Sequence, residues 1–154
     1  MSSVIDRSTP HITRKDLMLA TPGKLFSARG WIYETKYDGF RCLVCKHGDV
    51  VRLESRKGRD MSEQFPELVS EIRPIPQDFV ADGELVVLDD QGRPQWDRLH
   101  LRHTLHRPDR IREAATRDPA AIFAFDLLWL NGADFRERPL LDGKAAVHRT
   151  LSAN

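Results

Sequence analysis

A lysine followed closely by an Asp-Gly pair and an arginine is the part of this sequence with the most chemical content. Lys36, Asp38-Gly39 and Arg41 lie within one short stretch. An ordinary lysine has a pKa of about 10.4 and is a poor nucleophile at neutral pH. Nearby positive charge or desolvation lowers that pKa, and Arg41 could supply the charge. The pattern predicts either a nucleophilic Lys36 or an ordinary surface turn at a strand end.

Acidic residues interrupt two otherwise apolar stretches. Asp82 and Glu84 fall within residues 79–88, and Asp126 falls within residues 121–130. A buried carboxylate needs an arginine, a metal ion or a hydroxyl group as its partner, because a charged group loses its hydration on burial. These positions therefore predict either functional carboxylates or ion pairs that only stabilise the fold.

Local patterns predict the strands that position these residues. Residues 31–36 alternate between apolar and polar side chains, which predicts a half-buried strand ending at Lys36. Two strand-like segments, 40–46 and 50–55, flank a turn at 47–49 and predict a β-hairpin. Further strands are expected at 79–88, interrupted by Asp82-Gly83, and at 121–130, which is apolar enough for a buried central strand.

Helices are expected between and after these strands, so the sequence predicts an α+β fold with antiparallel sheets and packed helices rather than a doubly wound sheet. Proline at position 108 favours the first turn of a helix. The expected helices span 60–72, 95–106, 108–117 and 141–151, and residues 15–20 form a short helix or a loop.

Composition limits the class of protein. The chain has 154 residues and a net charge of +1, which excludes a globally basic nucleic-acid coat. The length fits one domain, with residues 1–20 as an irregular N-terminal segment. No apolar run suits a membrane helix and no secretion signal is visible. With only two cysteines, a cytoplasmic protein without membrane partners is expected.

Five ordered segments resemble the adenylation domain of ATP-dependent DNA ligases. The first, Glu34–Arg41, is similar to the lysine motif Lys-x-Asp-Gly-x-Arg. One such motif is weak evidence, but an ordered set with ligase-like spacing is strong evidence. The resemblance is greatest to the ligase part of bacterial end-joining enzymes, and it makes residues 21–154 a partial adenylation domain. The other segments are 55–58 with 65–68, 79–86, 94–99 and 124–132.

The resemblance implies a role for each matching side chain. Lys36 would attack the α-phosphate of ATP, expel pyrophosphate and carry AMP as a phosphoramidate. Glu34 would contact the adenine amino group, and Phe125 would stack on the adenine. Arg41 and Arg56 would hold the ribose or the phosphates, and later the phosphate at the nick.

The resemblance also implies a metal ion and partners. Glu84 would bind the ribose hydroxyl or position Mg²⁺, a hard cation that prefers oxygen ligands and phosphates. Positioning and charge neutralisation do most of the work in phosphoryl transfer. ATP and nicked duplex DNA are the implied substrates, and nick sealing in DNA repair and recombination is the implied activity.

This sequence departs from the family pattern at its late elements. It contains no Lys-x-Lys, no Glu-Gly element ending in lysine and no oligonucleotide-binding domain, and it carries Asp142-Gly143-Lys144 where the family tends to have arginines. We therefore expect a ligase of impaired activity that binds ATP weakly and self-associates through an uncovered sheet. The alternative is a non-catalytic ligase remnant that binds ATP or DNA weakly. An mRNA capping enzyme ranks third, because residues 124–132 and the Arg56 segment fit DNA ligases better.

Neither the cysteines nor the histidines predict a metal site. Cys42 and Cys45 are three apart in an expected strand and point to opposite faces, and no second pair exists. His100, His103 and His106 drift around a helix rather than converging on one ion.

The remaining arginines and tryptophans have less specific interpretations. The arginines of residues 102–117 predict either a solvated helical face or a patch that contacts DNA phosphates. Trp31, Trp96 and Trp129 are expected to pack in the core.

Overall fold

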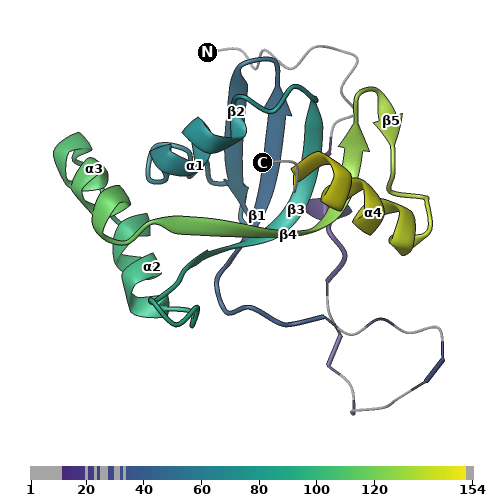
Figure 1. Ribbon diagram of the computed structural model, residues 1–154, viewed down its shortest axis with the longest axis horizontal. Coiled ribbons are helices and arrows are strands. Elements are labelled where there is room, and N and C mark those ends of the chain that lie inside the picture. Colours follow the sequence, from purple (N-terminus) through teal and green to yellow (C-terminus); the bar gives the residue numbers. More distant parts are fainter. Residues whose placement is uncertain are drawn as a thin grey trace.

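The helices and strands follow one another as an α+β arrangement in a computed structural model, which describes residues 12–19, 21–22, 24, 28–29, 32 and 34–151 (Figure 1). They are the 3-10 turn η1 (Arg14–Asp16), β1 (Phe40–His47), β2 (Val50–Ser55), α1 (Pro66–Ile72), β3 (Phe79–Val87), α2 (Trp96–His103), α3 (Pro108–Arg117), β4 (Ala120–Leu130), β5 (Ala133–Asp134) and α4 (Leu140–Leu151).

The strands form one antiparallel sheet in the order β2-β1-β3-β4-β5. The α+β class and the hairpin of β1 and β2 are thus confirmed. β3 is the central strand and includes Asp82-Gly83, the polar pair that interrupts its apolar sequence. Its pairing with β4 shifts register beside Asp82 and beside Val80. Such shifts re-aim side chains on the bulged strand.

β4 is not the central strand that its apolar sequence suggested. β5 pairs with it only at Trp129 and Leu130, so the rest of β4 borders no further strand among the described residues. Its first half is only partly buried, and α4 packs along it. The apolar sequence of β4 therefore reflects packing against a helix as well as against the sheet.

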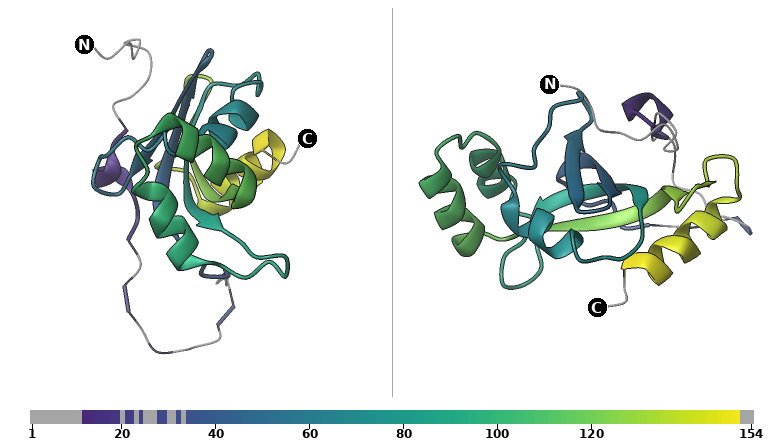
Figure 2. Two further views of the ribbon diagram at one scale, coloured as in Figure 1. Left: turned by 90° about the vertical axis from the view of Figure 1, so that its left-hand side faces the viewer. Right: turned by 90° about the horizontal axis from the view of Figure 1, so that it is seen from above.

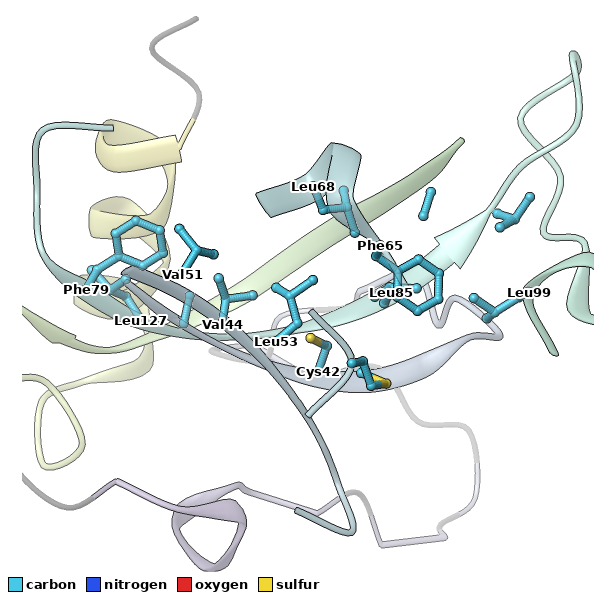
Figure 3. Close-up of a cluster of buried hydrophobic side chains, with 14 of the residues drawn as sticks. Cys42, Val44, Val51, Leu53, Phe65, Leu68, Phe79, Leu85, Leu99 and Leu127 are labelled. Atoms are coloured by element: carbon cyan, nitrogen blue, oxygen red, sulfur yellow. The ribbon is translucent and has the colours of Figure 1, made fainter. Parts of the chain in front are cut away.

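Two apolar clusters cover the two faces of the sheet. The larger cluster holds Cys42, Phe65, Leu85 and Leu99, and α1 and α4 pack over it (Figure 3). The smaller cluster gathers Leu43, Val80 and Trp129 under Leu17, the residue that follows η1. Cys42 lies in the first cluster and Cys45 packs against the second, as expected for strand residues three apart.

α2 and α3 lie side by side at one end of the sheet, where β4 begins (Figures 1 and 2). Arg102 of α2 joins this pair to α1, because it bridges to Glu67 and donates to Gln64 O at 2.8 Å and to Asp118 O at 3.0 Å. It is 1% exposed, so this arginine belongs neither to a solvated face nor to a DNA-contacting patch.

Several expected boundaries are wrong. The helix expected at 60–72 begins only at Pro66, because proline restricts the residue before it and Met61 N donates instead to Leu53 O at 2.8 Å. Trp96 is 49% exposed and contacts Phe40 edge to face, whereas Trp129 is buried as expected. Trp31 lies outside the described residues. No described helix is long and apolar enough to cross a membrane.

Candidate active site

A cleft of about 1200 Å³ lies between residues 34–39, strands β1, β3 and β4, and helix α4. Five of the six side chains that the sequence singled out line it, and they come from three strands and the segment before β1. These five are Glu34, Lys36, Arg41, Glu84 and Phe125.

Lys36 lies in irregular chain just before β1. The strand expected at 31–36 is therefore wrong over residues 34–36, and Trp31 and Tyr33 lie outside the described residues. The Lys36 side chain is 87% exposed, and its Nζ donates to Asp38 Oδ1 at 2.8 Å. Asp38 raises the Lys36 pKa, which is the opposite of the lowering expected from Arg41. Lys36 is thus a cation here and must lose a proton before it can act as a nucleophile.

Arg41 is paired with the buried carboxylate of Asp82. Its Nε and Nη2 donate to the two Asp82 oxygens at 2.6 and 2.5 Å, and Nη2 also donates to Met18 O at 2.8 Å. Desolvation raises the pKa of Asp82, and Arg41 opposes that rise. The guanidinium also lies over the Phe125 ring, 4.6 Å from its centroid. Asp82 therefore has the arginine partner that its apolar strand required.

Gly39 brings the Lys36 segment against β3. Its N–H donates to Glu84 Oε1 at 3.2 Å. A β-carbon at position 39 would collide with Leu85 O, so only glycine allows this approach. Burial raises the pKa of Glu84, while the Gly39 N–H and Arg41 partly oppose the rise. The Asp-Gly pair thus sets the distance between the lysine and the carboxylate of Glu84.

Aromatic side chains from β4 form one wall of the cleft. The Phe123 ring stacks on Tyr37, with centroids 3.9 Å apart and an interplanar angle of 4°. Phe125, two residues further, lies where the pairing with β3 shifts register. The stack fixes the chain directly after Lys36, because Tyr37 is its immediate neighbour. No sequence motif indicates this aromatic pair.

Helix α4 supplies Lys144, which we had not singled out as a site residue. Its Nζ donates to Glu34 Oε1 and, at 3.1 Å, to Phe125 O. Gly143 allows this approach, because a β-carbon there would collide with Asp126 Oδ1. Burial raises the pKa of Asp126, and Lys144 partly opposes the rise. No local sequence pattern could indicate the pairing of Lys144 with Glu34, because the two residues are 110 positions apart.

Arg56 is the one sequence-predicted site residue that the cleft lining does not include. It is exposed in the turn that follows β2. Because Ser55 pairs with Cys42, this turn lies at the same end of the sheet as Arg41.

Most of the remaining arginines already have acidic partners. Arg107 pairs with Asp109 at 2.7 Å, and Arg110 pairs with Glu113 at 2.9 Å. Arg117 pairs with Asp118 at 2.7 Å. The stretch 102–117 is therefore closer to a solvated, internally paired face than to a free phosphate-binding patch.

The cleft is acidic overall. Three of its carboxylates already pair with its cations, in the pairs Lys36–Asp38, Arg41–Asp82 and Lys144–Glu34. Glu84 and Asp126 form no such ion pair with any described residue, and burial raises the pKa of both. A polyphosphate would therefore be repelled unless a cation came with it.

The fold and the cleft together are those of a nucleotidyltransferase domain, and the sequence matches the ATP dependent DNA ligase domain family over residues 18–154. The chain belongs to this family and is an adenylation domain of ATP-dependent DNA ligase type. The resemblance inferred from five short segments is thereby confirmed.

Several known proteins are similar to this chain. The bifunctional non-homologous end joining protein LigD of Bacillus subtilis is 37% identical over 80% of this chain, and DNA ligase C of Mycobacterium tuberculosis is 42% identical over 75%. The crystal structure of the ligase domain from M. tuberculosis LigD superposes with a TM-score of 0.62 at 30% identity, covering 78% of this chain and 36% of that one. The chain spans 21% and 32% of the two curated relatives.

Proposed function

We propose that the cleft binds ATP and that Lys36 becomes covalently adenylated. The Lys36 Nζ lone pair would attack the α-phosphorus, forming a P–N bond as the bond to the bridging oxygen breaks and pyrophosphate leaves. The proton on Nζ has an acceptor at hand, since Asp38 Oδ1 lies 2.8 Å away. The product is a lysyl-AMP phosphoramidate, from which AMP would pass to the 5′ phosphate of nicked duplex DNA before sealing.

The observation that carries this proposal is the meeting in one cleft of five residues from three separate motifs. Lys36 and Glu34 precede β1, Arg41 lies within β1, and Glu84 and Phe125 come from β3 and β4. Phosphoryl transfer needs such convergence, because positioning and charge stabilisation lower its barrier more than covalent chemistry by the protein does.

The cleft suits Mg²⁺ that arrives with ATP. No group of three or more His, Cys, Asp or Glu side chains in the described part of the chain could hold a metal ion by itself. Mg²⁺ usually binds through one or two carboxylates together with substrate phosphates and water. Glu84, with Asp126 nearby in the lining, would supply such ligands, and the ion would neutralise charge on the triphosphate.

One observation favours the second candidate, a ligase remnant that binds nucleotide without reacting. Each lysine or arginine of the cleft lining is already paired with a carboxylate, so binding phosphates would require breaking an ion pair. The sequence also contains no Lys-x-Lys that could add positive charge. We therefore propose that the 154 residues alone seal nicks slowly, even if adenylation occurs.

Incubation with α-labelled ATP and Mg²⁺ tests adenylation. We expect covalent label on Lys36, located by mass spectrometry, and its loss in Lys36→Ala and in Lys36→Arg, whose guanidinium stays protonated. Lys15→Ala is the matched control, because Lys15 is an exposed lysine outside the cleft lining. Label on another lysine would refute the assignment. ATP binding without label would favour the second candidate, and Phe125→Ala should weaken that binding.

A further inference from the structure

Lys144 closes one side of the cleft through contacts that the reaction described above does not use. Its side chain is 20% exposed, and it joins α4 to Glu34 before β1 and to the backbone of β4 at Phe125 O. Lys144 thereby joins the Glu34 carboxylate to the strand that carries Phe125, the residue that the family resemblance places against the adenine.

We infer that Lys144 is a positioning residue that makes the cleft select a purine with an amino group at position 6. This inference rests on the proposed function, because it takes the adenosine pocket as given. Lys144 binds Oε1 of Glu34 and so orients the carboxylate with its other oxygen available as an acceptor. Lys144 touches no part of the nucleotide in this role and acts only through Glu34.

The selectivity follows from donors and acceptors. An ionised carboxylate only accepts hydrogen bonds. The 6-amino group of adenine donates, whereas the 6-oxo group of hypoxanthine presents an acceptor, which the carboxylate would repel. A carboxylate that rotates freely could turn away from the 6-oxo group at little cost. A carboxylate that Lys144 holds cannot turn away from the 6-oxo group. Lys144 therefore turns a weak preference for the 6-amino purine into a strong one.

The close packing of α4 makes the position of Lys144 precise. Gly143 lies against the Asp126 carboxylate, which would have to turn away if residue 143 carried a β-carbon. The second hydrogen bond, to Phe125 O at 3.1 Å, limits the rotation of the lysine side chain. Two fixed acceptors on different elements leave the ammonium little freedom, and so Glu34 has little freedom too.

The test compares the affinities of the protein for ATP and inosine triphosphate, which differ only at the purine, by titration calorimetry. We expect Lys144→Met to reduce the preference for ATP by roughly tenfold, which corresponds to about 1.4 kcal/mol, because the Glu34 carboxylate loses the charged partner that orients it. Lys144→Arg should keep most of the preference. Arg149→Met is the matched control, because Arg149 is an exposed cation of the same helix.

A double variant separates action through Glu34 from other roles. In a Glu34→Gln background, Lys144→Met should change the ATP preference little further, because its effect passes through the carboxylate. The inference would be overturned if Lys144→Met weakened the binding of ATP and inosine triphosphate equally. It would also be overturned if the effects of Lys144→Met and Glu34→Gln on the ATP preference were additive.

The same variants keep this inference distinct from adenylation. If the wild-type protein prefers ATP, Lys144→Met loses that preference and no covalent label forms, the proposed adenylation is refuted and the role of Lys144 is supported. If Lys36 is labelled and Lys144→Met keeps the preference for ATP, adenylation is supported and the role of Lys144 is refuted. A folded protein that binds neither nucleotide would overturn both.

Discussion

At the scale of single residues, Asp38 opposes the loss of a proton that the proposed nucleophile Lys36 requires. Lys36 is expected to react as a neutral amine, yet its Nζ donates to Asp38 and its pKa is raised. Arg41 was the expected source of a lowered pKa, but Asp82 takes up its guanidinium. A lysine with these neighbours stays protonated until substrate binding changes its surroundings.

Replacing Asp38 with Asn should therefore lower the Lys36 pKa toward the ordinary lysine value. The raised pKa comes first from the hydrogen bond and the charge of Asp38, and the amide keeps at most a weaker hydrogen bond. Acetylation by limiting acetic anhydride, followed across pH by mass spectrometry, should show Lys36 reacting at lower pH in the variant. Lys15 in the same sample is the reference lysine. An unchanged Lys36 profile would show that Asp38 does not set the charge state.

At the scale of elements, one buried arginine ties α1, α2 and α3 together. The guanidinium carbon Cζ of Arg102 lies 4.7 Å from the centroid of the Phe65 ring, and Arg102 forms an ion pair with Glu67. Glu67 in turn accepts from Ala120 N, the first residue of β4, at 3.0 Å. The helices at this end of the sheet are therefore held by a polar network as well as by apolar contacts.

Arg102→Met should destabilise the fold by about 3–5 kcal/mol, because Glu67 and two carbonyl groups lose their partner in a buried place. Urea unfolding followed by circular dichroism measures this loss. Arg102→Lys should also destabilise, since an ammonium cannot make the paired hydrogen bonds of a guanidinium. Arg98→Met is the control, because the half-exposed Arg98 pairs with Asp118 at 3.3 Å, and its loss should cost less than about 1 kcal/mol. Similar losses for the two methionine variants would contradict this account.

The sequence predicted elements well where the signal is local. The boundaries of β2 and α3 match the expected ones, since the hairpin turn and Pro108 lie next to them. The helix expected from residue 60 was wrong, because Glu54 forms a bridge with Asp60 that no nearby residue announces. Likewise, motifs could name the residues that carry chemistry, but the ion pairs Arg41–Asp82 and Lys144–Glu34 join positions far apart in the sequence. Lys144 was missed for that reason.

At the scale of the whole molecule, the two edges of the sheet differ in how completely their strands are paired. At one edge, β2 pairs along its whole length with its hairpin partner β1. On the other side, residues 120–128 of β4 pair with no strand beyond β3 among the described positions, and Leu140 and Leu141 of the neighbouring α4 are exposed. An exposed apolar strand edge can pair with another chain.

We therefore expect the 154-residue protein to self-associate as its concentration rises, through the first half of β4. Ala121→Lys adds a charge to this edge, where repulsion and hydration oppose pairing between copies. Sedimentation velocity over a concentration series should show a rising average mass for the wild-type protein and a reduced rise for the variant. Val50→Lys is the matched control, because it adds the same charge at an exposed position on the opposite edge strand. A wild-type protein that stays monomeric at every concentration, or a control that dissociates it equally well, would rule out association through β4.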